Sequence, residues 1–94
     1  MTIYVIKQFT RQDNGYLDIG SNVGFFSYLE KAVDVVENNV FDLSEDGYYE
    51  YTVILQLNEG LYQPSTEEHW YHWEIDKYVE CEKPQEFEPF AFII

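Results

Sequence analysis

One amphipathic segment in the first half of the chain constrains the fold more than any other feature. Its apolar residues recur at i, i+3, i+4, i+7 and i+11, which places them on one face of a helix. Ser27, followed three positions later by Glu30, matches a capping box at a helix start. Turn-forming residues at 44–47 follow the segment. The pattern predicts an α-helix over about residues 28–41, whose apolar face carries Leu29, Ala32, Val33, Val36 and Val40.

The residues before this helix predict two strands joined by a turn. Residues 3–9 are rich in β-branched and aromatic side chains, and both alternating faces carry apolar residues, which is typical of a strand inside a sheet. Asp13-Asn14-Gly15 favours a tight turn, with residues 16–19 as a short partner strand. Residues 20–24 are rich in Gly, Ser and Asn, and are expected to form a loop leading into the helix.

The residues after the helix predict two longer strands. Residues 48–57 and residues 70–80 each alternate between an apolar face and a more polar one. The apolar tail at residues 90–94 is expected to dock on the sheet or against a second copy of the chain. Together, the predicted helix and strands indicate a single α+β domain over residues 1–94. We expect a three- to five-stranded, mainly antiparallel sheet in the order ββαββ(β), with the helix packed on one face.

Net charge is the strongest compositional signal. Eighteen acidic residues face five basic ones, which gives a charge of −13 at pH 7. Residues 42–94 hold thirteen of the acids and two of the bases. This field repels phosphates, so we expect no direct binding to DNA or RNA. Because aromatic residues make up 19% of the chain, it has the apolar area to fold despite its self-repulsion.

Targeting and redox features favour the cytoplasm. The chain contains no run of about 18 apolar residues, so we expect no membrane-spanning helix and no membrane partner. The N-terminus lacks the basic-then-apolar pattern of a signal peptide. Cys81 is the only cysteine, so no internal disulfide can form and a reducing compartment is indicated. If the protein is phage-encoded, that compartment is the host cell cytoplasm.

The segment around residues 67–74 contains a candidate metal site. His69 and His72, with Glu68 or Glu74, supply side chains of the types that bind zinc. Positions three apart on a strand point to opposite faces, however, so the two imidazoles should diverge. We therefore expect an aromatic core with a solvated edge here, and no metal or other cofactor.

Catalytic chemistry has little support in the sequence. Cys81 lies between Glu80 and Glu82, whose negative field should raise the pKa of the thiol and disfavour the thiolate. The chain has no nucleophile elbow, phosphate-binding glycine loop or HExxH motif. We expect a non-enzymatic protein without catalytic residues.

The expected helix carries a row of acidic side chains that could face a partner. Glu30, Asp34 and Glu37 recur at i, i+4 and i+7, which places them on one side of the helix. The simpler interpretation is a solvated outer face. The sharper one is a contact surface for a basic protein.

A second acidic row is expected on the strand at residues 70–80. Glu74, Asp76 and Glu80 would alternate on one face at about 6.6–7 Å per two-residue step, close to the spacing of phosphates along DNA. Glu50 could lie on the same face of the sheet. Tyr78, interleaved with these acids, would supply the apolar contact that interfaces need.

The stretch VGFFSYLEKAVDVVE resembles the entry to a capped helix in small uncharacterised bacterial and phage domains, where a strand leads into the helix. In its size, acidity and lack of catalytic motifs, the chain resembles the small acidic proteins that phages use against host nucleases, including anti-CRISPR proteins. That resemblance implies an inhibitor that mimics nucleic acid and occupies the basic surface of a nucleic-acid-binding effector.

Two other hypotheses stay open from the sequence. One is an immunity protein that neutralises a basic nuclease toxin, which relies on the same electrostatics. The other is a small ligand-binding or metabolic domain, in which the acidity serves only solubility. A homodimer through Phe90, Phe92, Ile93 and Ile94 is compatible with all three hypotheses.

Overall fold

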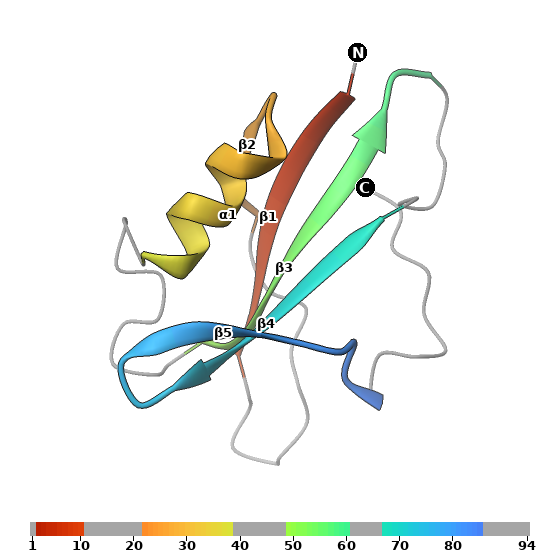
Figure 1. Cartoon of the computed structure of the whole chain (residues 1–94). Helices are drawn as coiled ribbons and strands as arrows, with labels where there is room; N and C mark the ends of the chain where they lie inside the picture. Colours follow the sequence, from red (N-terminus) through yellow and green to blue (C-terminus); the bar gives the residue numbers. More distant parts are fainter. Residues whose placement is uncertain (1, 11–21, 39–48, 61–66, 86–94) are drawn as a thin grey trace.

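A computed structural model of the chain describes residues 2–10, 22–38, 49–60 and 67–85. These residues form a five-stranded antiparallel sheet with one helix, so the predicted α+β class is confirmed (Figure 1). The strands lie in the order β2-β1-β3-β4-β5. The elements are β1 (Thr2–Thr10), β2 (Asn22–Phe26), α1 (Leu29–Glu37), β3 (Tyr49–Asn58), β4 (Glu68–Glu74) and β5 (Lys77–Cys81).

Strand β1 lies inside the sheet, as its two apolar faces predict. It pairs antiparallel with β2 on one side and with β3 on the other. Ile6 lies opposite Ile54 of β3, and Phe9 lies opposite Tyr51. Ile6 and Phe9 differ by an odd number of positions, so they face opposite sides of the sheet, and both are fully buried.

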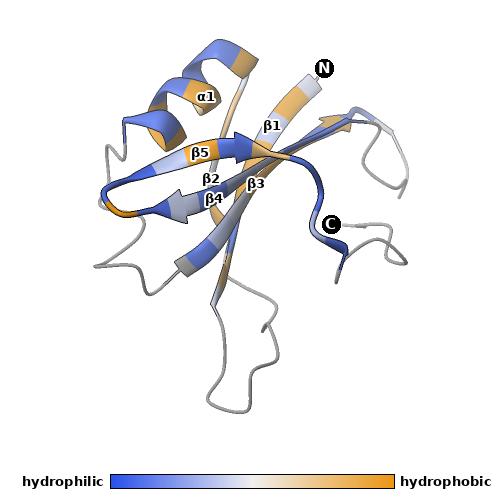
Figure 2. Cartoon of the chain, turned by 60° about the horizontal axis from the view of Figure 1, so that its bottom comes forward, coloured by the Kyte–Doolittle hydropathy of each residue, from blue (hydrophilic) through white to orange (hydrophobic). Residues whose placement is uncertain are grey.

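The core is divided between the two faces of the sheet. On one face, α1 buries Ala32, Val35 and Val36 against the sheet. Ala32 and Val36 belong to the predicted apolar stripe, whereas Val35 lies outside it. Leu29 and Val33 of that stripe are partly buried against the same cluster. Figure 2 shows α1 lying over the sheet, with hydrophilic positions as well as apolar ones around its circumference. The sheet residues in this cluster are Ile6, Ile54, Tyr71 and Tyr78.

The opposite face holds a second buried cluster. Its members are Phe9, Val53, Leu55 and Trp70, with Tyr51 and Cys81 packed at its margin. The rings of Phe9 and Trp70 stack at a centroid distance of 5.8 Å. Burial of an aliphatic or aromatic side chain of this size stabilises a fold by about 1.5–3 kcal/mol. The central strands are therefore held from both sides.

The start of α1 differs from the predicted capping box. The N-cap residue is Tyr28, and it makes no side-chain capping hydrogen bond. Ser27 lies one position too early in the chain to serve as the N-cap, so the Ser27–Glu30 box does not form. At the other end, the amide side chain of Asn38 donates to the Asp34 carbonyl and carboxylate oxygens at 3.0 and 2.7 Å. Residues 39–41 of the predicted helix lie outside the described residues.

The predicted loop at residues 20–24 is wrong where the structure describes it. Residues 22–24 belong to β2, which pairs with β1 with Val5 opposite Phe25 and Ile6 opposite Gly24. Gly24 and its polar neighbours suggested a loop, but pairing with the open edge of β1 outweighed that local preference. The predicted turn at residues 13–15 and strand at residues 16–19 lie outside the described residues, as does the tail at residues 90–94.

The predicted single strand over residues 70–80 is also wrong. The chain reverses at Ile75 and Asp76, so β4 and β5 form a hairpin in which Glu74 lies opposite Lys77. Two-residue hairpin turns favour Gly, Asn or Asp because they require positive φ. Here Ile75 adopts a φ of 48°, so the usual sequence signal is missing.

Replacing Ile54 tests whether the stability of the fold depends on the side chains buried in the central strands. Ile54 is completely buried under α1 in β3, so Ile54→Ala is expected to lower the free energy of unfolding by about 2–5 kcal/mol. Urea denaturation followed by circular dichroism measures this loss. Ile75→Ala removes the same atoms from a side chain that is 97% exposed, and is expected to cause no comparable loss. Equal losses in the two variants would contradict the assignment of the core.

Replacing Ile75 tests the strain in the hairpin turn. A β-branched residue at positive φ is unfavourable by about 1–3 kcal/mol, whereas Asn tolerates this conformation. Ile75→Asn is therefore expected to raise the free energy of unfolding by about 1 kcal/mol. Ile75→Thr is the matched control, because it removes apolar exposure but keeps the branched Cβ. If both variants were equally stabilised, exposure rather than strain would be the cause.

Candidate functional site

Acidic side chains dominate the described surface. Nine of them are exposed, whereas Glu50 and Glu68 are half-buried. The exposed ones are Glu30, Asp34, Glu37, Glu59, Glu67, Glu74, Asp76, Glu80 and Glu82.

The acidic row predicted on the helix is present. Glu30, Asp34 and Glu37 are all exposed on the side of α1 that faces away from the sheet. Asp34 accepts a hydrogen bond from the Asn38 side chain. Within the described residues, Glu30 and Glu37 form no ion pair with a basic side chain, so their charges are not neutralised locally.

The second predicted row does not form, because the hairpin rearranges its members. A two-residue turn brings Tyr78 opposite Trp73 and Glu80 opposite Tyr71, so odd positions of β4 share a face with even positions of β5. Glu80 therefore lies on the helix side of the sheet, whereas Glu74 belongs to the opposite face. Asp76 lies in the turn itself.

Tyr78 and Glu50 also have positions that differ from the expected contact surface. Tyr78 is only 3% exposed, and its ring meets that of Trp73 edge-on at 5.1 Å, so it belongs to the core beneath α1. Glu50 is half-buried in β3, at a register shift where Phe9 pairs with Tyr51 and Thr10 pairs with Tyr49. The strand register therefore does not bring Glu50 into a row with Glu74, Asp76 and Glu80.

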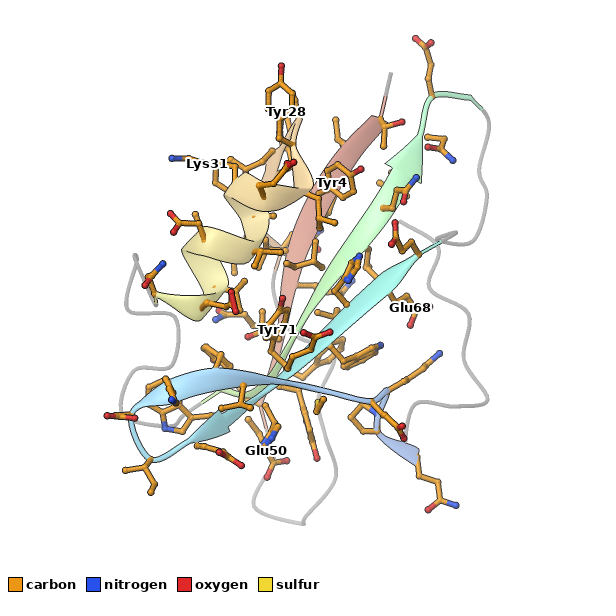
Figure 3. The ribbon with its side chains drawn as sticks, viewed as in Figure 1. Tyr4, Tyr28, Lys31, Glu50, Glu68 and Tyr71 are labelled. Carbon is orange, nitrogen blue, oxygen red and sulfur yellow. The ribbon has the colours of Figure 1, made fainter. Side chains whose placement is uncertain are left out.

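Tyr71 marks the place where the acids of α1 and β5 approach each other. Figure 3 shows Tyr71 rising from β4 on the side where α1 lies. Burial raises the pKa of Tyr71 to about 12, with further upward contributions from the negative charges of Glu37 and Glu80. The row on the helix therefore continues onto β5. We call Glu30, Asp34, Glu37 and Glu80 the acidic ridge.

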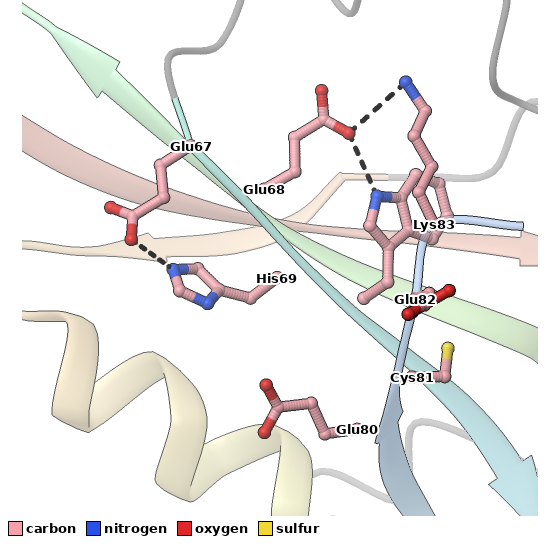
Figure 4. A pocket seen from close by; sticks show the side chains of 8 residues that line it. Glu67, Glu68, His69, Glu80, Cys81, Glu82 and Lys83 are labelled. Carbon is pink, nitrogen blue, oxygen red and sulfur yellow. Dashed lines mark hydrogen bonds and ion pairs between the residues drawn. The ribbon is translucent and has the colours of Figure 1, made fainter.

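A hollow of about 470 Å³ opens beside the ridge, where β4 begins and β5 ends (Figure 4). Glu68 accepts a hydrogen bond from the Trp70 indole N–H at 2.9 Å and lies 3.5 Å from the Lys83 ammonium. The hollow is strongly negative, because one lysine faces four carboxylates. Its lining residues are Glu67, Glu68, His69, Trp70, Glu80, Cys81, Glu82 and Lys83.

The two histidines diverge, as their spacing predicts. His69 lies opposite Ile54 on the helix side, whereas His72 lies opposite Tyr51 on the other face. Each lies near a different carboxylate: His69 Nε2 is 3.1 Å from Glu67 Oε1, and His72 Nε2 is 3.4 Å from Glu74 Oε1. Among the described residues, no group of three or more His, Cys, Asp or Glu side chains could hold a metal ion.

Cys81 has the electrostatic setting that the sequence indicates. Burial and the Glu80 carboxylate raise the pKa of its thiol, with burial as the larger cause. At neutral pH, the thiol form is therefore favoured over the nucleophilic thiolate.

No helix in the described part of the chain is long and apolar enough to cross a membrane.

Comparison of the chain with known protein families, with curated proteins and with solved structures finds no match. The geometry and charge of this surface are therefore what indicates a function.

Titration of Tyr71 tests whether Glu37 of α1 and Glu80 of β5 both lie near its hydroxyl group. Its pKa is higher in the folded protein than in the unfolded chain, so its contribution to stability is complete below about pH 10 and is lost as the pH rises toward 12. The difference in phenolate absorbance between the wild type and Tyr71→Phe isolates this group. Glu37→Gln combined with Glu80→Gln is expected to lower the pKa of Tyr71 but to leave it above 10, because burial remains.

The control for this titration removes the same number of charges elsewhere. Glu74→Gln combined with Asp76→Asn changes acids that do not contribute to the Tyr71 shift. An equal fall in the pKa of Tyr71 in this control would show a general effect of net charge. It would contradict the specific proximity of Glu37 and Glu80 to Tyr71.

Proposed function

We propose that this protein is a non-catalytic acidic inhibitor, which acts in the cytoplasm and occupies a basic, nucleic-acid-binding surface of another protein. The observation that carries the proposal is the acidic ridge, which joins exposed carboxylates from α1 and β5 on one side of the molecule. Lysine and arginine side chains that hold phosphates can also hold carboxylates through charge-assisted hydrogen bonds.

The spacing along α1 supports this kind of mimicry. A helix rises 1.5 Å per residue, so Asp34 lies about 6 Å along the axis from Glu30, and Glu37 lies about 4.5 Å further. Phosphates along one DNA strand are about 6–7 Å apart, because of the rise of about 3.4 Å per base pair and the helical sweep. A basic groove that follows a phosphate row could therefore accept these carboxylates.

The lack of local neutralisation also supports the proposal. In the described residues, the carboxylates of Glu37 and Glu80 make no ion pair, whereas Glu68 is bridged to Lys83. Unpaired carboxylates extend a negative potential into solvent, which accelerates the encounter with a basic partner. Apolar contacts must supply much of the affinity. Tyr28, at the start of α1, is 72% exposed and can provide such a contact next to the ridge.

The test is capture of the partner, followed by competition with nucleic acid. Immobilised protein is exposed to host lysate, with and without phage infection, and the captured protein is then challenged with duplex DNA. We expect a basic protein that is retained at about 50 mM salt and released at about 200 mM salt or by DNA. Asp34→Asn with Glu37→Gln and Glu80→Gln is expected to weaken its capture at least tenfold.

The matched control removes three exposed acids outside the ridge: Glu59→Gln, Glu74→Gln and Asp76→Asn. It is expected to retain most of the binding, with an unchanged circular dichroism spectrum. A partner that DNA does not displace would contradict the decoy mechanism. Capture of a nuclease toxin, whose activity the protein blocks, would favour the immunity hypothesis instead.

A further inference from the structure

The turn of the β4–β5 hairpin carries an isoleucine that packing inside the described chain does not require. Four large apolar side chains of the described residues are exposed, and Ile75 is the most exposed of them, at 97%. It belongs to neither buried cluster. Apolar residues scattered singly over a surface are ordinary. Ile75 differs from them because its backbone conformation is also unfavourable for its residue type.

The backbone at Ile75 is strained. Its φ is 48°, and the Asp76 N–H donates a hydrogen bond to the Glu74 carbonyl, which closes a γ-turn centred on Ile75. A γ-turn with positive φ at its central residue is rare and strained, and a β-branched side chain makes this conformation more unfavourable. Asn or Gly would avoid both the strain and the exposed apolar surface. Strain that the fold does not require is typical of functional sites.

The hairpin holds this side chain in a defined position. Trp73 lies opposite Tyr78, and their rings meet edge-on at 5.1 Å. Tyr78 is buried beneath α1, so the two strands are attached to the core one residue pair away from the turn. A contact that is already held in place loses less conformational entropy on binding. The hairpin therefore presents Ile75 as a preorganised contact.

The turn lies at the end of the molecule where the acidic ridge also ends. Figures 1 and 2 both show the β4–β5 turn on the same side as the C-terminal end of α1. Ile75 is five positions from Glu80, so strand geometry keeps their Cα atoms within about 17 Å of each other. A standard interface covers about 800 Å² on each partner, which is about 30 Å across. Ile75 and the ridge therefore fit within one interface.

The residues around Ile75 indicate what kind of surface would cover it. Glu74 and Asp76 are exposed on either side of it and Lys77 follows, so the turn has a net negative charge. An acidic pocket would repel this turn, whereas an apolar pocket bordered by lysine or arginine side chains fits it. Proteins that hold single-stranded nucleic acid combine these features, because aromatic side chains that stack on bases lie beside a basic groove.

We propose that Ile75 is an apolar anchor, which enters such a pocket on the basic partner, beside the surface that receives the acidic ridge. The inference rests on the proposed function, since it assigns an apolar contact to the same partner. Tyr28 lies at the N-terminal end of α1 and Ile75 at the far end of the ridge, so both ends of the charged row have an exposed apolar residue. The acids accelerate and orient the encounter, whereas Ile75 slows release.

Affinity measurements with turn variants test the proposal. The protein that the wild type captures is identified and purified, and its dissociation constant is measured for each variant at one salt concentration. Ile75→Asn is expected to weaken binding at least tenfold, although it is expected to stabilise the fold, so unfolding cannot explain the loss. Ile75→Val keeps an apolar branched side chain, and is expected to bind within about threefold of the wild type.

Binding kinetics separate the anchor from the ridge. Ile75→Asn leaves the charge unchanged, so it is expected to raise the dissociation rate and to leave the association rate within about twofold. The ridge variant, Asp34→Asn with Glu37→Gln and Glu80→Gln, is expected to slow association. Val23→Asn is the matched control, because Val23 is an exposed apolar residue in β2, at the opposite edge of the sheet from β5. It should bind within about threefold of the wild type.

The outcomes distinguish this inference from the proposed function. Wild-type affinity in Ile75→Asn, with weakened binding by the ridge variant, would overturn the anchor and leave the inhibitor function intact. Equal losses in Ile75→Asn and either Ile75→Val or Val23→Asn would also overturn the anchor. Wild-type affinity in the ridge variant would contradict the proposed function instead. Capture of no basic protein would overturn both.

A crosslink identifies the surface that covers the turn. In a Cys81→Ser background, Ile75→Cys is labelled with a maleimide-linked benzophenone and irradiated with the purified partner. Mass spectrometry is expected to place the crosslink among apolar residues that have lysine or arginine close by. Glu59→Cys with the same label is the control, and should crosslink at least tenfold less. Equal crosslinking, or a crosslink to an acidic surface, would overturn the proposal.

Discussion

The burial of β1 and β3 on both faces is the interaction on which the rest of the structure depends. Ile6 and Ile54 pack beneath α1, while Phe9 and Val53 are buried on the opposite face. A chain with a charge of −13 repels itself, so compaction requires concentrated apolar contacts in the centre. Placing the apolar residues on the inner strands leaves the helix surface and the β4–β5 hairpin to carry the acids.

Local periodicity was enough to predict the elements that this core holds. The strands at β1 and β3 and the apolar face of α1 follow from spacing alone, because each repeats a contact pattern over several residues. The turn at Ile75 could not be predicted, since its conformation is imposed by strand pairing on a residue that disfavours it. Gly24 gives the opposite error. The conformational freedom of glycine predicts a loop, but Gly24 lies in β2 and pairs with β1.

The candidate site was predictable only where it lies on one element. The row of Glu30, Asp34 and Glu37 follows from helical spacing. Glu80 joins that row because a two-residue turn exchanges odd and even positions between β4 and β5. The same exchange moves Tyr78 into the core and separates Glu74 from Glu80. One unrecognised turn therefore redistributed most of the acidic face, and the environment of Tyr71 between α1 and β5 could not be foreseen.

The acids of the described residues are placed unequally among the elements. Six lie in residues 67–85 and three lie on α1, whereas the strands β1 and β2 carry none. In the field of any cationic surface, a torque will rotate the protein before the two molecules touch. The hairpin and the acidic ridge then face that surface at the moment of contact.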